Sequence, residues 1–523
     1  MAVSACLALA FSAVGCEKKT VANDENTLEI FICNFGYGTD WLYAEVEEFK
    51  KADWVTAKYP DLNVVVDKPI ADQAMANSKI MSGKEGNTAD LLFTCSETGN
   101  VYYESGLYLD LTSLYDTTIP GESVKVKDKM NQNKYTERLY TTDSGEEVIY
   151  SFPWVNGFSG MFINVTAANS ILGEDYLMPR TTQELAQMCT DIKESSTNTK
   201  GVKPFISCST YYQSMFNIWW AQYEGVEEYS NFFYGIADGE MSNKIFEQTG
   251  RLRALQELES IMGYESGNVD SMSTEMEFMQ LQANFFNGNG VMMPNGDWLE
   301  NEMKAISSGE ITILKNPVIS TIVETLSVVK ADEELAFVVQ CVDEHKDYET
   351  TKAAFNEQFT KELPQSDYER IYEARNVLFA WGGHEAYIPS YSVASELAKD
   401  FLLFMATDKG VETFMKATMG CQTAFTYDVE TKNPTLYDSL SRLQKDHVEI
   451  NKTGIMLLDR AQTRLCALGG LKALQQTNLQ SKFLNVNAAA RETAQQIFDY
   501  DIEYYSTANG RFEIMLKQAG LKG

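Results

Sequence analysis

The segment Leu28-Glu-Ile-Phe-Ile-Cys33, followed by Asn34-Phe-Gly-Tyr-Gly38, has the pattern of a short buried strand that ends at a glycine-containing turn. The apolar spacing that comes next predicts a helix over residues 40–51. Two further strands are predicted at residues 63–67 and 89–93, separated by a second helix. These three strands and two helices decide the fold class.

Their order predicts an α/β fold in which parallel strands are joined by right-handed crossovers. Open sheets of this kind bind ligands at the carboxyl ends of their strands. Further along the chain, Thr142-Asp-Ser-Gly145 predicts a hairpin turn, and helical periodicity dominates from Ser395 onward. We therefore expect an α/β protein with a helix-rich C-terminus.

The composition narrows the classes of function. The chain has 523 residues, with 74 acidic against 43 basic side chains and a net charge of −31. Because phosphates are neutralised by clustered lysine and arginine, this balance argues against nucleic acid as a partner and against charge-driven binding to an anionic membrane. Three histidines in the whole chain offer little for a histidine-rich metal site. The length suits two large lobes or about three domains.

The N-terminus has a separate character. Residues 1–14 are uncharged and mostly apolar; they are too few to span a bilayer but suit the core of a signal peptide. The small residues Ala13-Val-Gly15 directly before Cys16 resemble the bacterial lipoprotein box, although no basic residue precedes the apolar core. This resemblance implies a signal peptide over residues 1–16, a lipid anchor at Cys16 and a polar tether over residues 17–27.

The cysteines do not suggest cross-links or metal ligands. Nine are present, and seven remain when Cys6 in the signal segment and Cys16 are set aside. An odd number at wide spacing, without a Cys-x-x-Cys pair, argues against a disulfide framework and against a zinc site. We expect most of these cysteines to be small buried hydrophobes, and we expect neither a metal ion nor a cofactor.

Several short segments occur in the order found in one known family. They include Ala89-Asp-Leu-Leu-Phe93, Gly160-Met-Phe-Ile-Asn164, Gly288-Asn-Gly-Val-Met-Met-Pro-Asn-Gly-Asp-Trp298 and Ala386-Tyr-Ile-Pro-Ser-Tyr391. Over about residues 28 to 427 the chain is similar to the extracellular solute-binding proteins of ABC importers, in particular the sugar-binding branch (family 1) that includes maltose-binding protein.

This resemblance implies a two-lobed clamp of the periplasmic-binding-protein type (type II), each lobe a mostly parallel sheet flanked by helices. Carried onto this chain, lobe 1 comprises residues 28–152 and 313–383, and lobe 2 comprises residues 153–312 and 384–523. The crossings would fall near Phe152-Pro153, near residues 314–317 and near residues 381–388, where proline or glycine occurs. Residues 330–375 and the tail after Tyr427 extend beyond the family core, and the tail is expected to pack on the second lobe.

The resemblance also brings six segments to the cleft: residues 31–43, 93–103, 152–162, 209–222, 290–303 and 379–391. They contain no lysine and no arginine, and they are rich in tryptophan and tyrosine. Aromatic faces offer apolar platforms, while carboxylates and amides fix a ligand's orientation through hydrogen bonds. This lining suits a neutral polyhydroxylated ligand, whereas an acidic ligand would require arginine or lysine. A cation held over the rings is an alternative.

The candidate ligand-binding residues from these segments are Trp298, Asp297, Trp41, Asp40, Glu97, Trp154, Asn156, Tyr211 and Trp381. Trp298 is the first choice as a stacking platform. For each residue the alternative is a place in the hydrophobic core, and Trp41 fits the core stripe of its helix equally well. No catalytic residue is predicted, because the chain has no nucleophile elbow, zinc-protease or Walker-type motif.

Taken together, the sequence predicts a substrate-binding lipoprotein and not an enzyme. It would capture a neutral sugar or oligosaccharide in the interlobe cleft and deliver it to the transmembrane subunits of an ABC permease. We expect a monomer on the extracytoplasmic face of the cell membrane, held there through the lipid anchor alone. The alternatives are a secreted glycoside hydrolase, which needs two carboxylates flanking a sugar, and a peptide- or polyamine-binding protein or sensor ligand module of the same fold.

Overall fold

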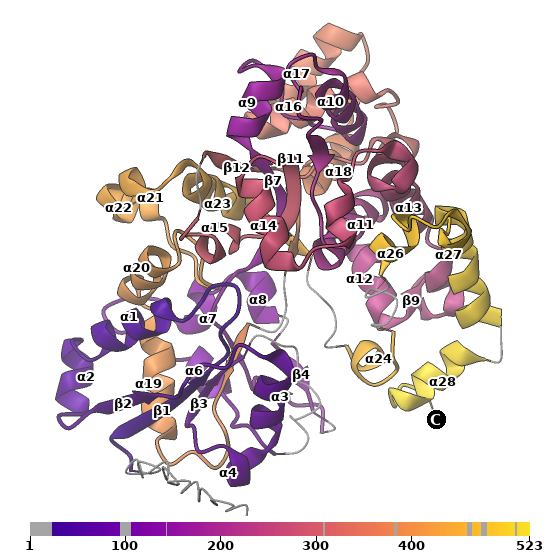
Figure 1. Ribbon diagram of the computed structural model, residues 1–523. Helices are drawn as coiled ribbons and strands as arrows, with labels where there is room; N and C mark the ends of the chain where they lie inside the picture. The colour runs from indigo at the N-terminus through magenta and orange to yellow at the C-terminus, as the bar shows by residue number, and fades with distance from the viewer. Residues whose placement is uncertain are drawn as a thin grey trace, which may run out of the picture.

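The computed structural model describes residues 24–94, 106–136, 138–142, 144–306, 309–380, 384–457, 463–471, 478–507 and 510–522. Figure 1 shows two lobes, one at the lower left and one above it, each built around a sheet with helices packed on it. The predicted two-lobed α/β architecture is confirmed. Among the described residues, no helix has both the length and the apolar character that a bilayer-spanning segment needs.

The first lobe contains a sheet with the strand order β2-β1-β3-β14-β6. Its strands are β1 (Thr27–Ile32), β2 (Asn63–Val66), β3 (Leu91–Phe93), β6 (Phe152–Pro153) and β14 (Glu385–Tyr387). Strand β1 pairs in parallel with both β2 and β3, as the sequence pattern predicts, with Ile30 opposite Val66 on one side and Leu91 on the other. Strand β14 runs antiparallel to β3 and β6.

Helices flank this sheet: α1 (Asp40–Phe49), α2 (Asp53–Lys58), α3 (Gln73–Met81), α4 (Gly83–Gly86), α6 (Thr112–Tyr115), α7 (Val126–Lys129), α8 (Gln132–Thr136), α19 (Ser395–Met405) and α20 (Asp408–Ala417). Helix α1 buries Trp41, Leu42, Val46 and Phe49, which is the amphipathic face expected of residues 40–51. The predicted hairpin is present as the antiparallel pair β4 (Tyr140–Thr141) and β5 (Glu147–Val148).

The second lobe is built on a sheet whose central strand is β7 (Phe158–Asn164), buried along its whole length. The other strands are β8 (Lys203–Phe205), β11 (Gly290–Gly296), β12 (Ile311–Leu314), β13 (Val377–Ala380) and β15 (Ile455–Leu457). Strands β11, β12 and β13 all pair antiparallel with β7. A separate small hairpin joins β9 (Ile236–Ala237) to β10 (Glu240–Met241).

The helices of the second lobe are α9 (Val165–Leu172), α10 (Thr182–Glu194), α11 (Ser209–Glu224), α12 (Val226–Tyr234), α13 (Thr249–Met262), α14 (Phe278–Phe286), α15 (Leu299–Glu302), α16 (Asp332–Asp343), α17 (Tyr348–Phe359), α18 (Gln365–Asn376) and α23 (Arg442–Thr453). Helices α21 (Val429–Lys432) and α22 (Pro434–Ser439) lead into α23. The charged stretch 330–375 thus forms α16 to α18, whose apolar side chains join the core of this lobe.

The lobe boundaries differ from the predicted ones. Strands β12 and β13 pair with β7, and the helices between them join the core of the second lobe. Residues 313–380 therefore belong to lobe 2 and not to lobe 1. Strand β14 pairs with β3 and β6, and the buried side chains of α19 and α20 join the first-lobe core, so residues 385–417 belong to the first lobe. Pro317 lies three residues after β12, inside the second lobe, where the next residue, Val318, forms a bridge with Thr181.

The crossings follow from this pairing. The chain leaves the first sheet between β6 and β7, as predicted at Phe152-Pro153, and returns between β13 and β14, inside the predicted range 381–388. The chain leaves the first lobe again between Phe425 and α23. Phe425 still forms a bridge with Met130 of the first lobe, whereas α23 packs against β12 of the second lobe. The predicted crossing at residues 314–317 is wrong.

The C-terminal helices α24 (Arg464–Ala467), α26 (Leu479–Phe483), α27 (Ala494–Ile502) and α28 (Arg511–Gln518) pack on the second lobe, along the right side of Figure 1. Arg251 of α13 binds one of these helices, α27, to the second lobe. Its guanidinium donates to Asp501 of α27 at 2.5 Å and to the Phe246 carbonyl at 3.0 Å, and it lies over the rings of Trp220, Phe232 and Phe498.

We predict that Arg251→Met lowers the free energy of unfolding by about 3 kcal/mol, because it leaves the buried Asp501 carboxylate without its partner. The matched control is Arg253→Met on the same helix, whose ion pair with Glu324 is partly exposed; its loss should be about 1 kcal/mol or less. Urea denaturation of both variants measures this. Equal losses in the two variants would contradict the account.

Candidate functional site

Tyr37 lies at the centre of the contact between the lobes. It comes from the turn after β1, and three rings meet it edge-on: Trp154 with a centroid separation of 5.6 Å, Trp298 at 5.4 Å and His384 at 5.2 Å. Trp154 follows β6, Trp298 follows β11 and His384 precedes β14. The ends of strands from both sheets therefore meet at one tyrosine.

The rings continue in both directions. On the first-lobe side, Trp154 stacks on Trp41 of α1 at 4.7 Å. On the second-lobe side, Trp298 lies 6.1 Å from Tyr211 of α11, which lies 5.4 Å from Phe278 of α14. We call the series Trp41, Trp154, Tyr37, Trp298, Tyr211 and Phe278 the aromatic row. It runs from the core of one lobe into the other, and its middle is closed to solvent, with Trp298 only 7% exposed.

Two glycines make this close approach possible. Gly36 adopts φ +52°, and a Cβ on it would lie 3.2 Å from the Trp298 ring. A Cβ on Gly157 would lie 2.2 Å from the Tyr37 hydroxyl oxygen. A side chain at Gly36 would be strained by the backbone, and one at Gly157 would displace Tyr37. The turn after the first strand fits against Trp298 of the second lobe because Gly36 has no side chain.

Asp297 joins the lobes electrostatically. The Tyr37 hydroxyl donates to its Oδ1 at 2.6 Å, and both residues are almost fully buried. Burial raises the pKa of Asp297 to about 7, although the Tyr37 bond opposes the rise. Burial and the neighbouring Asp297 raise the pKa of Tyr37 well above its ordinary value, so the tyrosine remains the donor. The contact holds a carboxyl group that is partly protonated at neutral pH.

Several buried polar atoms beside Tyr37 have no hydrogen-bond partner among the described residues. They are Trp154 Nε1, His384 Nδ1 and Asn156 Oδ1. Burial lowers the pKa of His384 to about 3, so its imidazole is neutral. Buried polar groups are normally paired, because leaving one unpaired costs about 1–3 kcal/mol.

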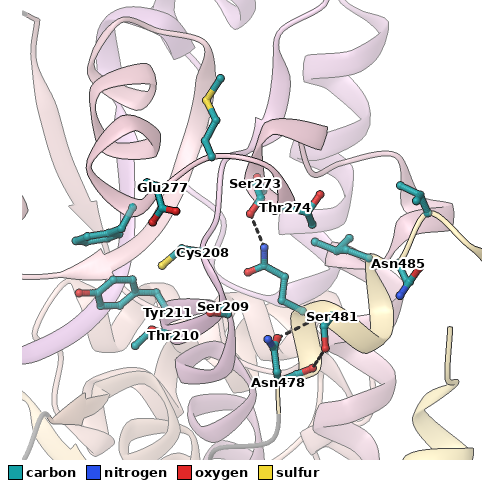
Figure 2. A pocket seen from close by; sticks show the side chains of 15 residues that line it. Cys208, Ser209, Thr210, Tyr211, Ser273, Thr274, Glu277, Asn478, Ser481 and Asn485 are labelled. Atoms are coloured by element: carbon teal, nitrogen blue, oxygen red, sulfur yellow. Dashed lines mark hydrogen bonds between the residues drawn. The ribbon is translucent and has the colours of Figure 1, made fainter. Parts of the chain in front are cut away.

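A cavity of about 660 Å³ adjoins the second-lobe end of the aromatic row, and we call it the side cavity. Figure 2 shows Ser209, Thr210 and Tyr211 on one side and Asn478, Ser481 and Asn485 on the other. Most of its polar side chains are hydroxyls and amides, and its lining includes the carboxylate of Glu277. It lies within the roughly 300–1,000 Å³ typical of ligand pockets.

Solved structures share this fold over nearly the whole chain. A substrate-binding protein of an ABC transporter, Lmo0181 from Listeria monocytogenes, in complex with cycloalternan, has 13% identity and a TM-score of 0.59, covering 95% of this chain and 100% of its own. A chitin oligosaccharide binding protein has 12% identity and a TM-score of 0.57, covering 94% and 99%. A family 1 extracellular solute-binding protein from Bifidobacterium longum subsp. infantis has 14% identity and a TM-score of 0.51, covering 92% and 100%.

This chain has the fold of the extracellular solute-binding proteins. At these identities the likeness concerns the fold, and what each relative binds is a property of that relative. A scan against protein-family models finds no match, and a search of curated proteins finds none either.

Within this solute-binding fold, five of the candidate residues come together: Trp298, Asp297, Trp154, Trp41 and Tyr211. Trp41 is fully buried, and its Nε1 donates to the Gly38 carbonyl, so it supports Trp154 from the first-lobe core. Asn156 donates to Asn451 at 2.9 Å. Asp40 is exposed and instead pairs with Lys304 across the lobes at 2.7 Å. Glu97, Trp381 and Cys16 lie outside the described residues.

The sequence candidates omit Tyr37 and His384, and of the residues that line the side cavity they include only Tyr211. Tyr37 has a recognisable signal, because it lies in a glycine turn directly after the first strand of the sheet. His384 has none, since a lone histidine carries no pattern. Asn478, Ser481 and Asn485 have none either, because the helical tail is expected only to pack on the lobe.

We predict that the stability difference between the wild type and Asp297→Asn depends on pH. The ordinary aspartate pKa is 3.8 and that of Asp297 is about 7, so the native protein keeps a proton that the unfolded chain loses. Wild-type stability relative to the variant should therefore fall as the pH rises from about 4 to about 7, by roughly 4 kcal/mol in total, and then level off. Denaturation at several pH values measures it.

His384→Gln provides a control of opposite sign. The pKa of His384 is lowered from 6.5 to about 3, so the unfolded chain binds a proton that the native protein lacks. Wild-type stability relative to this variant should rise with pH between about 3 and 6.5. A difference between the wild type and Asp297→Asn that is constant with pH, or that rises with it, would contradict the buried carboxyl.

Proposed function

We propose that this protein captures a neutral sugar or oligosaccharide between its lobes and delivers it to the permease of an ABC importer. The observation that carries the proposal is the aromatic row, which crosses the lobe interface and ends at a cavity lined by hydroxyls and amides. Sugar rings offer C–H faces to aromatic rings and hydroxyls to polar atoms, so this combination suits them. The fold supports the same role.

Trp298 is the platform that a ligand would use. In this structure its ring is covered by Gly36 and by the edge of Tyr37, so the turn of the first lobe occupies the place of a ligand. Separation of the lobes would uncover Trp298, Trp154 Nε1 and His384 Nδ1 together. A ligand that bridges both lobes then favours the closed state, because it makes more contacts there.

The energetics suit such a clamp. A micromolar affinity corresponds to about −8 kcal/mol. The bonds that join the lobes here include the one from Tyr37 to Asp297 and the one from Asn301 to the Gly36 carbonyl, together with the exposed Lys304–Asp40 pair. Each is a modest interaction in net terms. A bound sugar can therefore replace them.

The proposal includes how the protein is attached to the membrane and on which side it lies. Cys16 would carry the lipid anchor, with residues 17–27 as the tether, and the binding lobes would face the extracytoplasmic side of the membrane as a monomer. The charge balance of −31 suits a soluble outer surface. The solute-binding proteins with this fold support a binding role in place of an enzymatic one.

We predict that Trp298→Ala weakens binding of neutral oligosaccharides at least ten-fold, because it removes the stacking platform, which corresponds to about 1.4 kcal/mol or more. Isothermal titration calorimetry with xylo-, cello- and chito-oligosaccharides measures it, and thermal melting checks that the variant is folded. The matched control is Trp54→Ala, a half-buried tryptophan on α2 that packs on Phe49.

Unchanged affinity in Trp298→Ala would remove this residue from the site. A wild type that binds peptides or polyamines but no saccharide would overturn the ligand class. A wild type that releases shortened glycans under turnover conditions would support the hydrolase alternative instead.

A further inference from the structure

The side cavity contains the first turn of α11, a helix of 16 residues that begins at Ser209. Its N-cap residue is Cys208, whose sulfur receives weak contacts from the backbone N–H groups of Tyr211 and Thr210 and makes no capping hydrogen bond of normal geometry. Burial raises the pKa of the Cys208 thiol to about 11, so the group is neutral, and a thiol sulfur is a weak acceptor. The first N–H groups of a helix carry a partial positive charge and need acceptors. A ligand oxygen in the cavity could supply one.

A second, independent observation comes from the C-terminal extension. Gln480 of α26 lines the same cavity and is only 4% exposed. Its Nε2 donates to the Ser273 carbonyl at 2.7 Å, which fixes the orientation of the amide because a carbonyl only accepts. Its Oε1 is buried and has no partner among the described residues. A residue that lines the cavity therefore carries a buried acceptor that lacks a donor among the described residues.

The rest of the lining favours an uncharged ligand with hydroxyl groups. Ser209 and Thr210 are exposed to the cavity, and no hydrogen bond joins their hydroxyls to another described residue. Apolar side chains lie at the rim, with Met276 41% and Val486 74% exposed. Among the described residues, the lining includes the Glu277 carboxylate and no lysine or arginine. An anionic ligand would meet a carboxylate and an unpaired carbonyl oxygen, which disfavour it.

The side cavity also adjoins the site between the lobes. Tyr211 lines the cavity and belongs to the aromatic row, and Phe278 does the same from the opposite helix α14. A chain of sugar rings that begins at Trp298 would therefore pass Tyr211 and Phe278 and enter the cavity without leaving an aromatic surface.

We propose that the side cavity is a second subsite for a neutral oligosaccharide, built jointly by α11 and the C-terminal extension. In it, a ligand hydroxyl donates to Gln480 Oε1, and ligand oxygens accept from the first turn of α11. This inference rests on the proposed function and makes it more specific: the ligand is an oligosaccharide, its affinity rises with chain length, and residues 478–486 bind it directly.

The test blocks the cavity from an exposed position. Thr274 lines the cavity and the adjacent Glu275 does not, and both are exposed, so Thr274→Trp and Glu275→Trp form a matched pair that should fold alike. Calorimetry with xylo- and cello-oligosaccharides of two to five residues is the readout. Thr274→Trp should lower the affinity for the longest members at least ten-fold and that for the disaccharides no more than two-fold, while Glu275→Trp matches the wild type.

A second pair tests the Gln480 amide. Gln480→Met removes Oε1 together with the Nε2 that donates to Ser273, at nearly constant volume, and Gln495→Met makes the same change on α27, outside the cavity. Gln480→Met should reduce the gain in affinity with chain length, and Gln495→Met should leave it unchanged. An oligogalacturonate of matched length should bind the wild type at least ten-fold more weakly than the neutral sugars.

The outcomes separate the two proposals. If the wild type binds neutral sugars, and Thr274→Trp and Gln480→Met bind every length as it does, the subsite is overturned while the proposed function stands. An equal loss at every length would overturn the division into two subsites. If the wild type binds no saccharide, the proposed function itself fails and the subsite with it.

Discussion

The hydrogen bond from Tyr37 to Asp297 holds the two lobes together inside a dry interface, and the rest of the site depends on it. Because both groups are removed from water, the carboxyl group keeps a proton to nearly neutral pH and the tyrosine remains its donor. Glycines at positions 36 and 157 let the tyrosine reach this place. The flanking tryptophans exclude water on either side. The hydrogen bonds that join the lobes at this place are individually modest, and the ring contacts around Tyr37 make up the rest of the interface.

Much of the fold could be predicted from the sequence, since local patterns specify local elements. The strands at residues 28–33, 63–67 and 89–93 alternate with helices, and β1 pairs with both neighbours as that order requires. The lobe boundaries could not be predicted in the same way. They depend on β12 and β13 pairing with β7 more than 140 residues earlier in the chain. Pro317 has the same local pattern whether it lies in a hinge or in a loop within one lobe.

The site residues likewise fall into those that a local sequence pattern predicts and those that it does not. Trp154, Asp297 and Trp298 follow directly after strands, where α/β sheets bind ligands, and the structure brings them together. Asp40 and Trp41 are neighbours in sequence but lie about 100° apart around a helix, so one is exposed and the other buried. Gln480 had no signal at all, because its role arises from the packing of a distant tail against α11. The aromatic row and that tail are far apart in the sequence and come together only in the folded chain.

The most direct test of the central claim is a crystal structure of the protein in complex with the tightest-binding neutral oligosaccharide. The account predicts a sugar ring on Trp298, in the place now held by Tyr37 and Gly36, with the chain passing Tyr211 toward Gln480. An unchanged Tyr37–Asp297 contact, with the sugar bound elsewhere on the surface, would contradict it.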